Sequence, residues 1–347
     1  MQTNSLPEIK LTRDERAACD AAIRAGSKSF YAASLLLPPK TRKAARALYS
    51  FCRTSDDLVD DGNEDGTATA KLAARLDAIY AGRSYPILAD RAFAGVVAEH
   101  GISRVIPDAM IEGFVWDEQS RDYETEADLL DYCARVASTV GVMMAQIMGC
   151  RDRHSLARAA DLGLGMQLTN IARDVGEDAE RGRLYIPSQW LREEGVEPQD
   201  FLQNPELSEG LQRCVERLLA LADSFYSRAL SGVASLPLNC RPAIRSAALI
   251  YQAIGNEIRK NNHNSVDMRA STSTRKKLGL ITLASATPFP LIPTNRAAPH
   301  PSVAFLVDAS ALLAEPEVKT IDQRAARMLE LMLKAEDTRR RAQERSI

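Results

Sequence analysis

Two groups of oxygen-bearing side chains, far apart in the chain, have the types and spacing needed to bind a divalent cation. The first is Asp56, Asp57, Asp60 and Asp61, in which Asp56 and Asp60 are four residues apart and share one helix face. Like charges at this spacing destabilise a helix by about 0.2–0.5 kcal/mol per pair. Gly62 is expected to end the helix, which places the acids at the negative end of its dipole. A bound cation would offset both costs; the alternative is a solvated acidic helix end.

The second group lies in the stretch Gln167–Asp178. Asn170, Asp174 and Asp178 follow one another at intervals of four residues and line one face of a helix, with Gln167 just before them. Amide and carboxylate oxygens are hard ligands suited to Mg²⁺, and Mn²⁺ is a possible substitute. The alternative is an ordinary polar helix face, but the apolar residues around the stripe indicate burial. Two acidic stripes on partly buried helices would repel each other unless metal ions lay between them.

Basic side chains accompany both acidic groups. Arg53 lies three residues before Asp56, and Arg173 adjoins Asp174. An arginine can hold a phosphate with two parallel hydrogen bonds, which makes both residues candidates for binding a diphosphate whose departing charge must be stabilised. Arg46, by contrast, is expected to be a cation on a helix surface.

The elements that must position these residues are predicted to be helices throughout. Apolar residues recur at helical spacing almost everywhere and strand-like alternation is scarce, so the fold class is all-α. The two glycines inside the second motif helix, Gly165 and Gly176, indicate close approach of another helix or a ligand. Helices are predicted over residues 12–35, 40–61, 67–81, 86–100, 107–120, 126–149, 153–178, 208–232, 237–262 and 316–345. We expect one domain over 15–280 and a tail over 281–347, with a Pro-rich loop at 282–302 and a charged final helix.

Composition excludes several other classes of protein. The chain has 347 residues with 44 basic and 46 acidic side chains, and a formal net charge of −2 gives no electrostatic footprint for nucleic acid. The six cysteines form no CxxC pair and are expected to be reduced and mostly buried. Met143, Met144 and Met148 are expected to pack in the core. No signal peptide and no run long enough to span a membrane is evident.

Several stretches make the chain resemble the squalene/phytoene synthase family over about residues 20–280. They are Gly26–Tyr31 (GSKSFY), Leu35–Pro39 (LLLPP), Ala47–Asp60 (ALYSFCRTSDDLVD), Tyr132–Gly141 (YCARVASTVG), Gln167–Asp178 (QLTNIARDVGED) and Gly182–Pro187 (GRLYIP), followed by Trp190-Leu191 and Gly195-Val196. The resemblance implies the isoprenoid synthase fold, a helical bundle around a central apolar cavity with two aspartate-rich faces at its mouth.

The resemblance also assigns roles to individual residues. It implies that metal is bound by Asp56, Asp60, Asn170, Asp174 and Asp178. It implies substrate contacts by Ser27, Lys28, Ser29, Tyr49, Arg53, Gln167, Arg173 and Tyr251. The catalytic residues it implies are Asp56, Asp60, Asp174, Arg173 and Tyr49. Gly26 and the stretch Asn261–Asn264 depart from the family pattern.

The activity implied is that of a prenyltransferase in carotenoid biosynthesis. It joins two geranylgeranyl diphosphates head to head, through prephytoene diphosphate, to phytoene. The alternatives are the same chemistry on farnesyl diphosphate, giving squalene or dehydrosqualene, and a non-catalytic prenyl-binding relative. Chain length depends on cavity depth, so the C15 and C20 substrates both stay open here.

A C40 hydrocarbon product leads to an expectation about location. Moving such a product into water is costly, since burial is worth about 0.8 kcal/mol per CH₂. We therefore expect a cytoplasmic protein that docks transiently on a membrane surface, such as the inner membrane. The expected contact is the 282–302 loop, through Phe289, Leu291 and Ile292.

Overall fold

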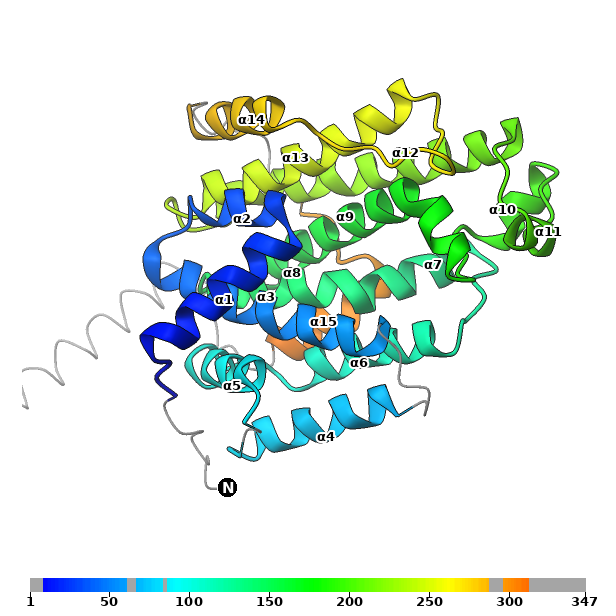
Figure 1. Cartoon of the computed structure of the whole chain (residues 1–347). Coiled ribbons are helices and arrows are strands. Elements are labelled where there is room, and N and C mark those ends of the chain that lie inside the picture. Colours follow the sequence, from blue (N-terminus) through cyan, green and yellow to red (C-terminus); the bar gives the residue numbers. More distant parts are fainter. Residues whose placement is uncertain (1–8, 61–66, 84–85, 287–295, 312–347) are drawn as a thin grey trace, which may run out of the picture. The chain divides into compact units, whose positions relative to one another are not determined.

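A computed structural model describes residues 9–60, 67–83, 86–286 and 296–311 (Figure 1). These residues form helices and connecting segments without a strand, which confirms the all-α prediction. The elements are α1 (Arg13–Gly26), α2 (Lys28–Ser34), α3 (Pro39–Asp60), α4 (Ala68–Tyr80), α5 (Leu88–His100), α6 (Val105–Glu118), α7 (Glu126–Cys133), the π-turn η1 (Ala134–Ser138), α8 (Thr139–Ile147), α9 (Arg153–Glu180), α10 (Ser188–Glu193), α11 (Pro198–Gln203), α12 (Glu209–Gly232), the 3₁₀ turn η2 (Val233–Ser235), α13 (Arg241–Lys260), α14 (Thr274–Ala286) and α15 (Pro301–Ala311).

The 28-residue helix α9, which carries the second acidic motif, is the centre of the packing. It contacts α7, α8, α11, α12, α13, α15 and η1. A Cβ at Gly176 would lie 2.2 Å from the carbonyl oxygen of Val266, and one at Gly165 would lie 3.2 Å from the Tyr226 ring. Both glycines therefore admit a close neighbour, as their position inside a helix predicted. This packing holds the second motif rigidly.

The predicted helix over 12–35 is wrong at one point, because it is two helices. Ser27 between α1 and α2 is extended, with φ −149° and ψ 101°. Its hydroxyl accepts a hydrogen bond from the backbone N–H of Phe30 at 3.2 Å and so caps α2. Helical periodicity continues across the break, which is why the pattern did not reveal it. The break turns α2 along α13 and toward the cavity described below.

Arg46 is not the surface cation that was expected. Its residue is 7% exposed, and its guanidinium is 2.7 Å from a carboxylate oxygen of Asp20 and 3.3 Å from the Ser34 hydroxyl. It also stacks 5.2 Å from the centre of the Tyr31 ring. The side chain ties α3 to α1 and α2, so its role is structural.

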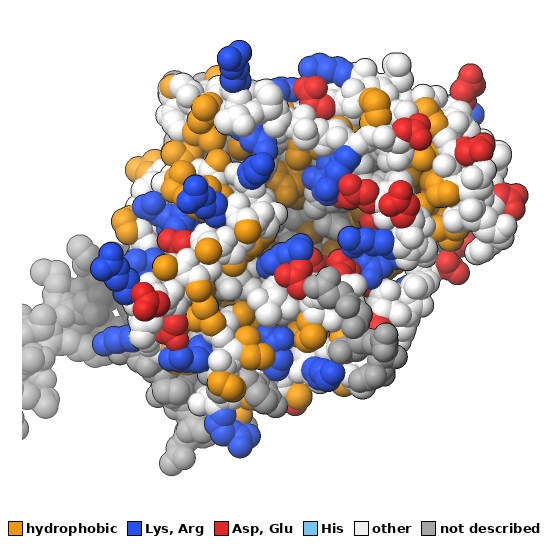
Figure 2. Space-filling view, viewed as in Figure 1, with side chains coloured by type: hydrophobic (Ala, Val, Ile, Leu, Met, Phe, Trp, Pro, Cys, Tyr) orange, Lys and Arg blue, Asp and Glu red, His pale blue; other side chains and the backbone are white. Residues whose placement is uncertain are grey.

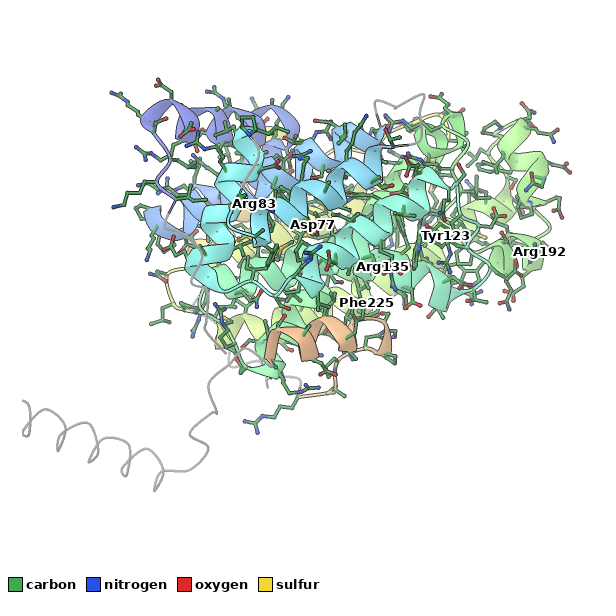
Figure 3. The ribbon with its side chains drawn as sticks, turned by 90° about the horizontal axis from the view of Figure 1, so that it is seen from below. Asp77, Arg83, Tyr123, Arg135, Arg192 and Phe225 are labelled. Carbon is green, nitrogen blue, oxygen red and sulfur yellow. The ribbon has the colours of Figure 1, made fainter. Side chains whose placement is uncertain are left out.

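Four helices in the second half of the chain, α10, α11, α14 and α15, were not predicted from the sequence. The predicted loop 282–302 is wrong at its ends, because residues 282–286 belong to α14 and α15 begins at Pro301. Arg228 donates to the carbonyl oxygen of Ala298 at 3.1 Å, and Arg153 pairs with Asp308. These contacts hold α15 against the bundle, where Figure 3 shows its ribbon. Phe289, Leu291, Ile292 and the helix predicted over 316–345 lie outside the described residues.

The remaining expectations about composition hold in the described part of the chain. All six cysteines are free, and all except the half-buried Cys52 are buried. Met143 is buried in the core, while Met144 and Met148 line the cavity. Within the described ranges, no helix combines the length and the apolar character needed to cross a membrane.

Candidate active site

The bundle encloses an apolar cavity that leads to the acidic motifs. Its wall comes from α1, α2, α3, α8, α9, α12, α13 and the turns η1 and η2, and its empty space, counted with the open mouth, is about 1380 Å³. Leucine, alanine, valine and methionine side chains make up most of the wall. Tyr49, Gln167, Asn170 and Tyr251 add polar groups to it. Such a cavity suits a long hydrocarbon chain whose polar head stays near these groups.

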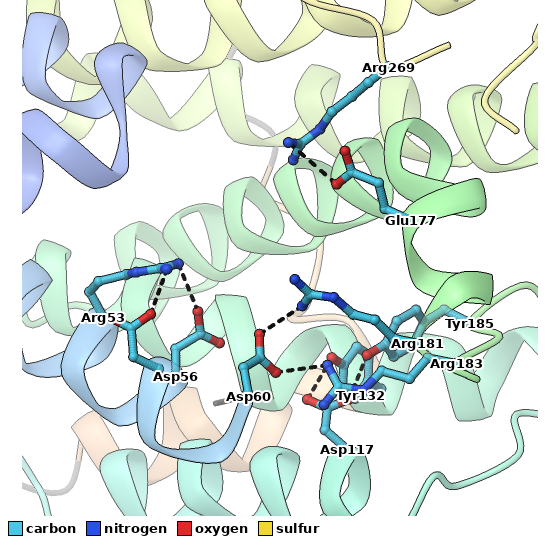
Figure 4. A network of polar contacts seen from close by, with 11 residues as sticks. Arg53, Asp56, Asp60, Asp117, Tyr132, Glu177, Arg181, Arg183, Tyr185 and Arg269 are labelled. Carbon is cyan, nitrogen blue, oxygen red and sulfur yellow. Dashed lines mark hydrogen bonds and ion pairs between the residues drawn. The ribbon is translucent and has the colours of Figure 1, made fainter. Parts of the chain in front are cut away.

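The first motif lies at the C-terminal end of α3, where arginines hold its carboxylates. Arg53 is 3.2 Å from Asp56 and 2.5 Å from Asp57. Asp60 accepts from Arg181 at 3.0 Å and from Arg183 at 2.9 Å, and both arginines come from the chain just after α9 (Figure 4). Partial desolvation, with the charge of Asp60 next, raises the pKa of Asp56 to about 6. At Asp56, burial and the neighbouring carboxylate therefore outweigh the stabilising charge of Arg53.

The second motif lies on α9. Asp174 accepts from Arg173 Nε at 2.7 Å and pairs with its Nη2, and it also accepts from Arg269 at 2.9 Å. Asp178 forms no side-chain ion pair among the described residues. Burial, followed by the charge of Asp174, raises its pKa to about 7. Asn170 donates to Gln167 at 3.3 Å.

The donor set fits a divalent cation of the Mg²⁺ type. Helix α3 supplies carboxylate oxygens and α9 supplies carboxylate and amide oxygens. The acids whose pKa values are raised would be stabilised in their charged form by a cation. Nowhere in the described ranges do three acidic, histidine or cysteine side chains converge on one point. Mg²⁺ characteristically takes one or two carboxylates and completes its shell with water and substrate phosphates, so binding it does not require three converging side chains.

The predicted substrate-binding residues other than Gln167 fall into three groups. Tyr49 and Tyr251 reach the cavity wall, where the Phe30 ring stacks on Tyr251 at 5.2 Å between ring centres. Ser27, Lys28 and Ser29 begin α2. Ser27 uses its hydroxyl to cap that helix, and its backbone N–H and C=O bond to Ile23 and Tyr31, so the side chains of Lys28 and Ser29 are the candidates here for a ligand. Arg53 and Arg173 are both engaged with acids of the motifs.

Tertiary structure adds basic residues that the sequence did not single out for this site. Burial, the charge of Lys28 and the charge of Arg173 lower the pKa of Lys277 on α14. Lys277 therefore lies in a cationic environment with residues from α2 and α9. Arg269 pairs with Asp174 at 2.9 Å and with Glu177 at 3.4 Å, and Figure 4 shows the pair with Glu177.

A second addition is a polar cluster behind Asp60, formed by Asp117, Tyr132, Tyr185 and Arg183. The hydroxyls of Tyr132 and Tyr185 donate to Asp117 at 2.9 and 2.7 Å (Figure 4). Burial raises the pKa of Asp117 to about 6, against the lowering effects of Tyr185 and Arg183. Tyr132, Arg183 and Tyr185 lie in stretches that carry the family resemblance, so the sequence could have indicated them as site residues. Asp117 lies outside these stretches.

An all-α bundle with paired acid-rich helices over a deep apolar cavity defines an isoprenoid synthase. The family model described as "Squalene/phytoene synthase" matches residues 23–278. The chain belongs to the squalene/phytoene synthase family, as its motifs predicted.

Curated relatives and solved structures agree with this assignment. The chain is 49% identical to "Phytoene synthase" of Rhodobacter capsulatus, over 84% of this chain and 89% of that protein. It is 39% identical to "15-cis-phytoene synthase" of Pantoea ananas, over 80% of this chain and 91% of that protein. The crystal structure of a dehydrosqualene synthase matches with a TM-score of 0.73 and 30% identity, covering 79% of this chain and 96% of that one.

Proposed function

We propose that this protein condenses two geranylgeranyl diphosphates head to head and converts the resulting prephytoene diphosphate to phytoene. One observation carries the proposal: two arginine-paired acidic motifs on α3 and α9 stand beside a deep apolar cavity in a chain 49% identical to a phytoene synthase. The motifs suit a diphosphate and the cavity suits prenyl chains.

The residues of the chain divide the chemical work. Asp56, Asp60, Asn170, Asp174 and Asp178 would hold the metal, and bound Mg²⁺ or Mn²⁺ would supply positive charge that stabilises the departing diphosphate. Arg53, Arg173, Lys28 and Ser29 bind diphosphate oxygens, with Gln167 beside them.

The apolar wall holds the prenyl chains in reacting geometry and keeps water from the allylic cations. Tyr49 and Tyr251 border this region with neutral phenols, since burial raises the pKa of Tyr49 and raises that of Tyr251 to about 12.

The C20 substrate is favoured over the C15 substrate by the pattern of similarity. The relatives named phytoene synthases reach 48–49% identity over most of the chain, whereas the matched dehydrosqualene synthase structure is 30% identical. A non-catalytic relative is disfavoured because both acidic motifs are intact. These comparisons support phytoene as the product.

Product analysis tests the proposal directly. The full chain is offered pure geranylgeranyl or farnesyl diphosphate with Mg²⁺, and the hydrocarbon products are identified by mass spectrometry. We expect phytoene from the C20 substrate, no turnover after exhaustive chelation, and recovery with Mg²⁺ or Mn²⁺. Undiminished activity after chelation would overturn the metal assignment, and a C30 product with no C40 product would overturn the substrate.

The same proposal includes a location. A phytoene-forming protein receives an amphipathic substrate and releases a hydrocarbon that water does not dissolve. We propose that the protein works in the cytoplasm and contacts a membrane surface transiently to exchange both molecules.

A further inference from the structure

Helix α14 (Thr274–Ala286) exposes two leucines on a side that no other described element covers. Ala284 is its one buried residue, and the helix packs mainly on α13. Leu278 and Leu283 are 59% and 51% exposed, although single exposed leucines are common on protein surfaces. What distinguishes α14 is that residues 278–286, LGLITLASA, carry no charge at all.

The charges at the other end of α14 are all positive. Arg275, Lys276 and Lys277 occupy its first turn, and no acidic residue occurs between Asp267 and the end of the helix. Lys276 pairs with Glu257 at 2.5 Å, and Arg275 is exposed. Figure 2 shows hydrophobic and Lys or Arg side chains together over the α14 region at the upper left of that face. Anionic lipid headgroups attract basic residues, and exposed apolar side chains can insert among the lipids beside them.

Helix α14 lies close to the cavity wall and to the basic residues of the candidate active site. Its main partner, α13, supplies Ala243, Ile244, Ala247 and Tyr251 to the cavity wall, and Lys277 is close enough to Lys28 and Arg173 to feel their charges. Helix α14 therefore lies along the outer side of α13, the helix that lines the cavity (Figure 1). A bilayer held there lies next to the place where prenyl chains are bound.

We propose that α14 is the membrane-docking element, with Leu278 and Leu283 inserted among the lipids of an anionic phospholipid bilayer and Arg275 against its headgroups. The proposal rests on the proposed function for the reason to dock, but the docking itself is measured without turnover. Opposite charge selects an anionic bilayer over a neutral one and makes binding weaken as salt rises.

Vesicle flotation of the full chain tests the proposal. The vesicles are phosphatidylcholine alone or phosphatidylcholine mixed with phosphatidylglycerol. We expect wild type to float with the mixed vesicles only, and the double variant Leu278→Ser/Leu283→Ser to lose on the order of 10-fold or more in partitioning, because two half-exposed leucines no longer enter the lipid. Arg275→Glu should also weaken flotation. The matched control, Val105→Ser/Leu207→Ser, removes two exposed apolar side chains elsewhere and should float like wild type.

Three outcomes would overturn the proposal. They are equal flotation of wild type and the α14 double variant, no flotation of wild type, and loss of flotation only in Phe289→Ser/Leu291→Ser/Ile292→Ser. If the α14 double variant differs from wild type in mass on size-exclusion chromatography but not in flotation, the exposed side of α14 would instead be assigned to contact with a second copy of the chain. Detergent-solubilised geranylgeranyl diphosphate separates the two proposals: failure to make phytoene sinks the proposed function, while flotation still decides docking. Thermal melting of each variant shows that the fold is intact.

Discussion

The acidic motifs on α3 and α9 carry the same kinds of ligand but are supported differently. On α3 the Asp56 side chain is 44% exposed, and the partners of Asp60 come from beyond the end of α9. On α9 the Asp174 side chain is 15% exposed and lies against Arg173, which is 17% exposed and belongs to the same helix. The first motif therefore lies at the more exposed end of α3, where arginines from beyond α9 pair with Asp60. In the second motif, Asp174 is more deeply buried.

The difference determines what removing an acid should do to the fold. Burial, followed by the Asp60 charge, raises the pKa of Asp56, so loss of Asp56 removes a desolvated charge and relieves a repulsion. Loss of Asp174 instead leaves Arg173 partly buried without its carboxylate, and an unpaired buried charge is costly. Activity should need both motifs, but stability should need mainly the second.

The largest expected effect compares Asp56→Ala with Asp174→Ala. Both variants should lose at least about 100-fold in turnover, because charge stabilisation of the departing diphosphate is impaired. Chemical denaturation should show Asp56→Ala near wild type and Asp174→Ala less stable by about 1–3 kcal/mol. The exposed Asp200→Ala serves as the control for both measurements. Equal stabilities of the two motif variants would remove the contrast drawn between them.

A substitution that keeps charge sharpens the comparison on α9. Arg173→Lys retains a cation but loses the planar fork, and it should slow turnover by less than the roughly 100-fold loss expected from removing a donor. Prephytoene diphosphate should accumulate, because the second ionisation uses the same groups to release diphosphate from this intermediate. Arg269→Lys, at the exposed edge of Asp174, is the matched control and should have a smaller effect. If Arg173→Lys turns over at the wild-type rate and no prephytoene diphosphate accumulates, Arg173 would have no role beyond its ion pair with Asp174.

On the α3 side, Asp117 tests whether the cluster behind Asp60 supports metal binding. Asp117→Asn removes the negative charge that faces Arg183 while keeping a group able to bond Tyr132 and Tyr185. We expect the Mg²⁺ concentration for half-maximal turnover to rise about 10-fold, the size usual for outer supporting residues. Tyr185→Phe, which keeps the charge, should shift it less, and the exposed Asp122→Asn should not shift it. An unchanged Mg²⁺ dependence in Asp117→Asn would limit the cluster to a packing role.

The smallest effect concerns the packing that holds α9. Gly176→Ala would place a Cβ 2.2 Å from the Val266 carbonyl oxygen and should destabilise the protein by about 1–3 kcal/mol. Gly279→Ala on α14 meets nothing within 4 Å and should stabilise the protein by about 0.5–1 kcal/mol. Urea unfolding of the two variants measures the pair. A stable Gly176→Ala would show that the segment around Val266 yields easily, which would weaken the argument that the second motif is rigid.

The sequence by itself determined the helical class, the two acidic motifs and the family, because these depend on local regularities. A spacing of four residues places Asp56 with Asp60, and Asn170 with Asp174, on one helix face in any fold that keeps the helix. The same holds for Gly165 and Gly176, whose presence inside a helix signals a close neighbour without identifying it. Resemblance over most of the chain then supplied the activity.

Only tertiary structure decided which partners these groups have. Arg181 and Arg183 meet Asp60 across more than a hundred residues of sequence, and Arg46 is buried because α1 and α2 fold over it. The break at Ser27 was equally hidden, since a hydroxyl cap interrupts a helix without interrupting its apolar period. The physical reason is common to these cases: periodicity is set by the backbone, whereas the burial and pairing of a charge are set by whichever segments the packed core brings against it.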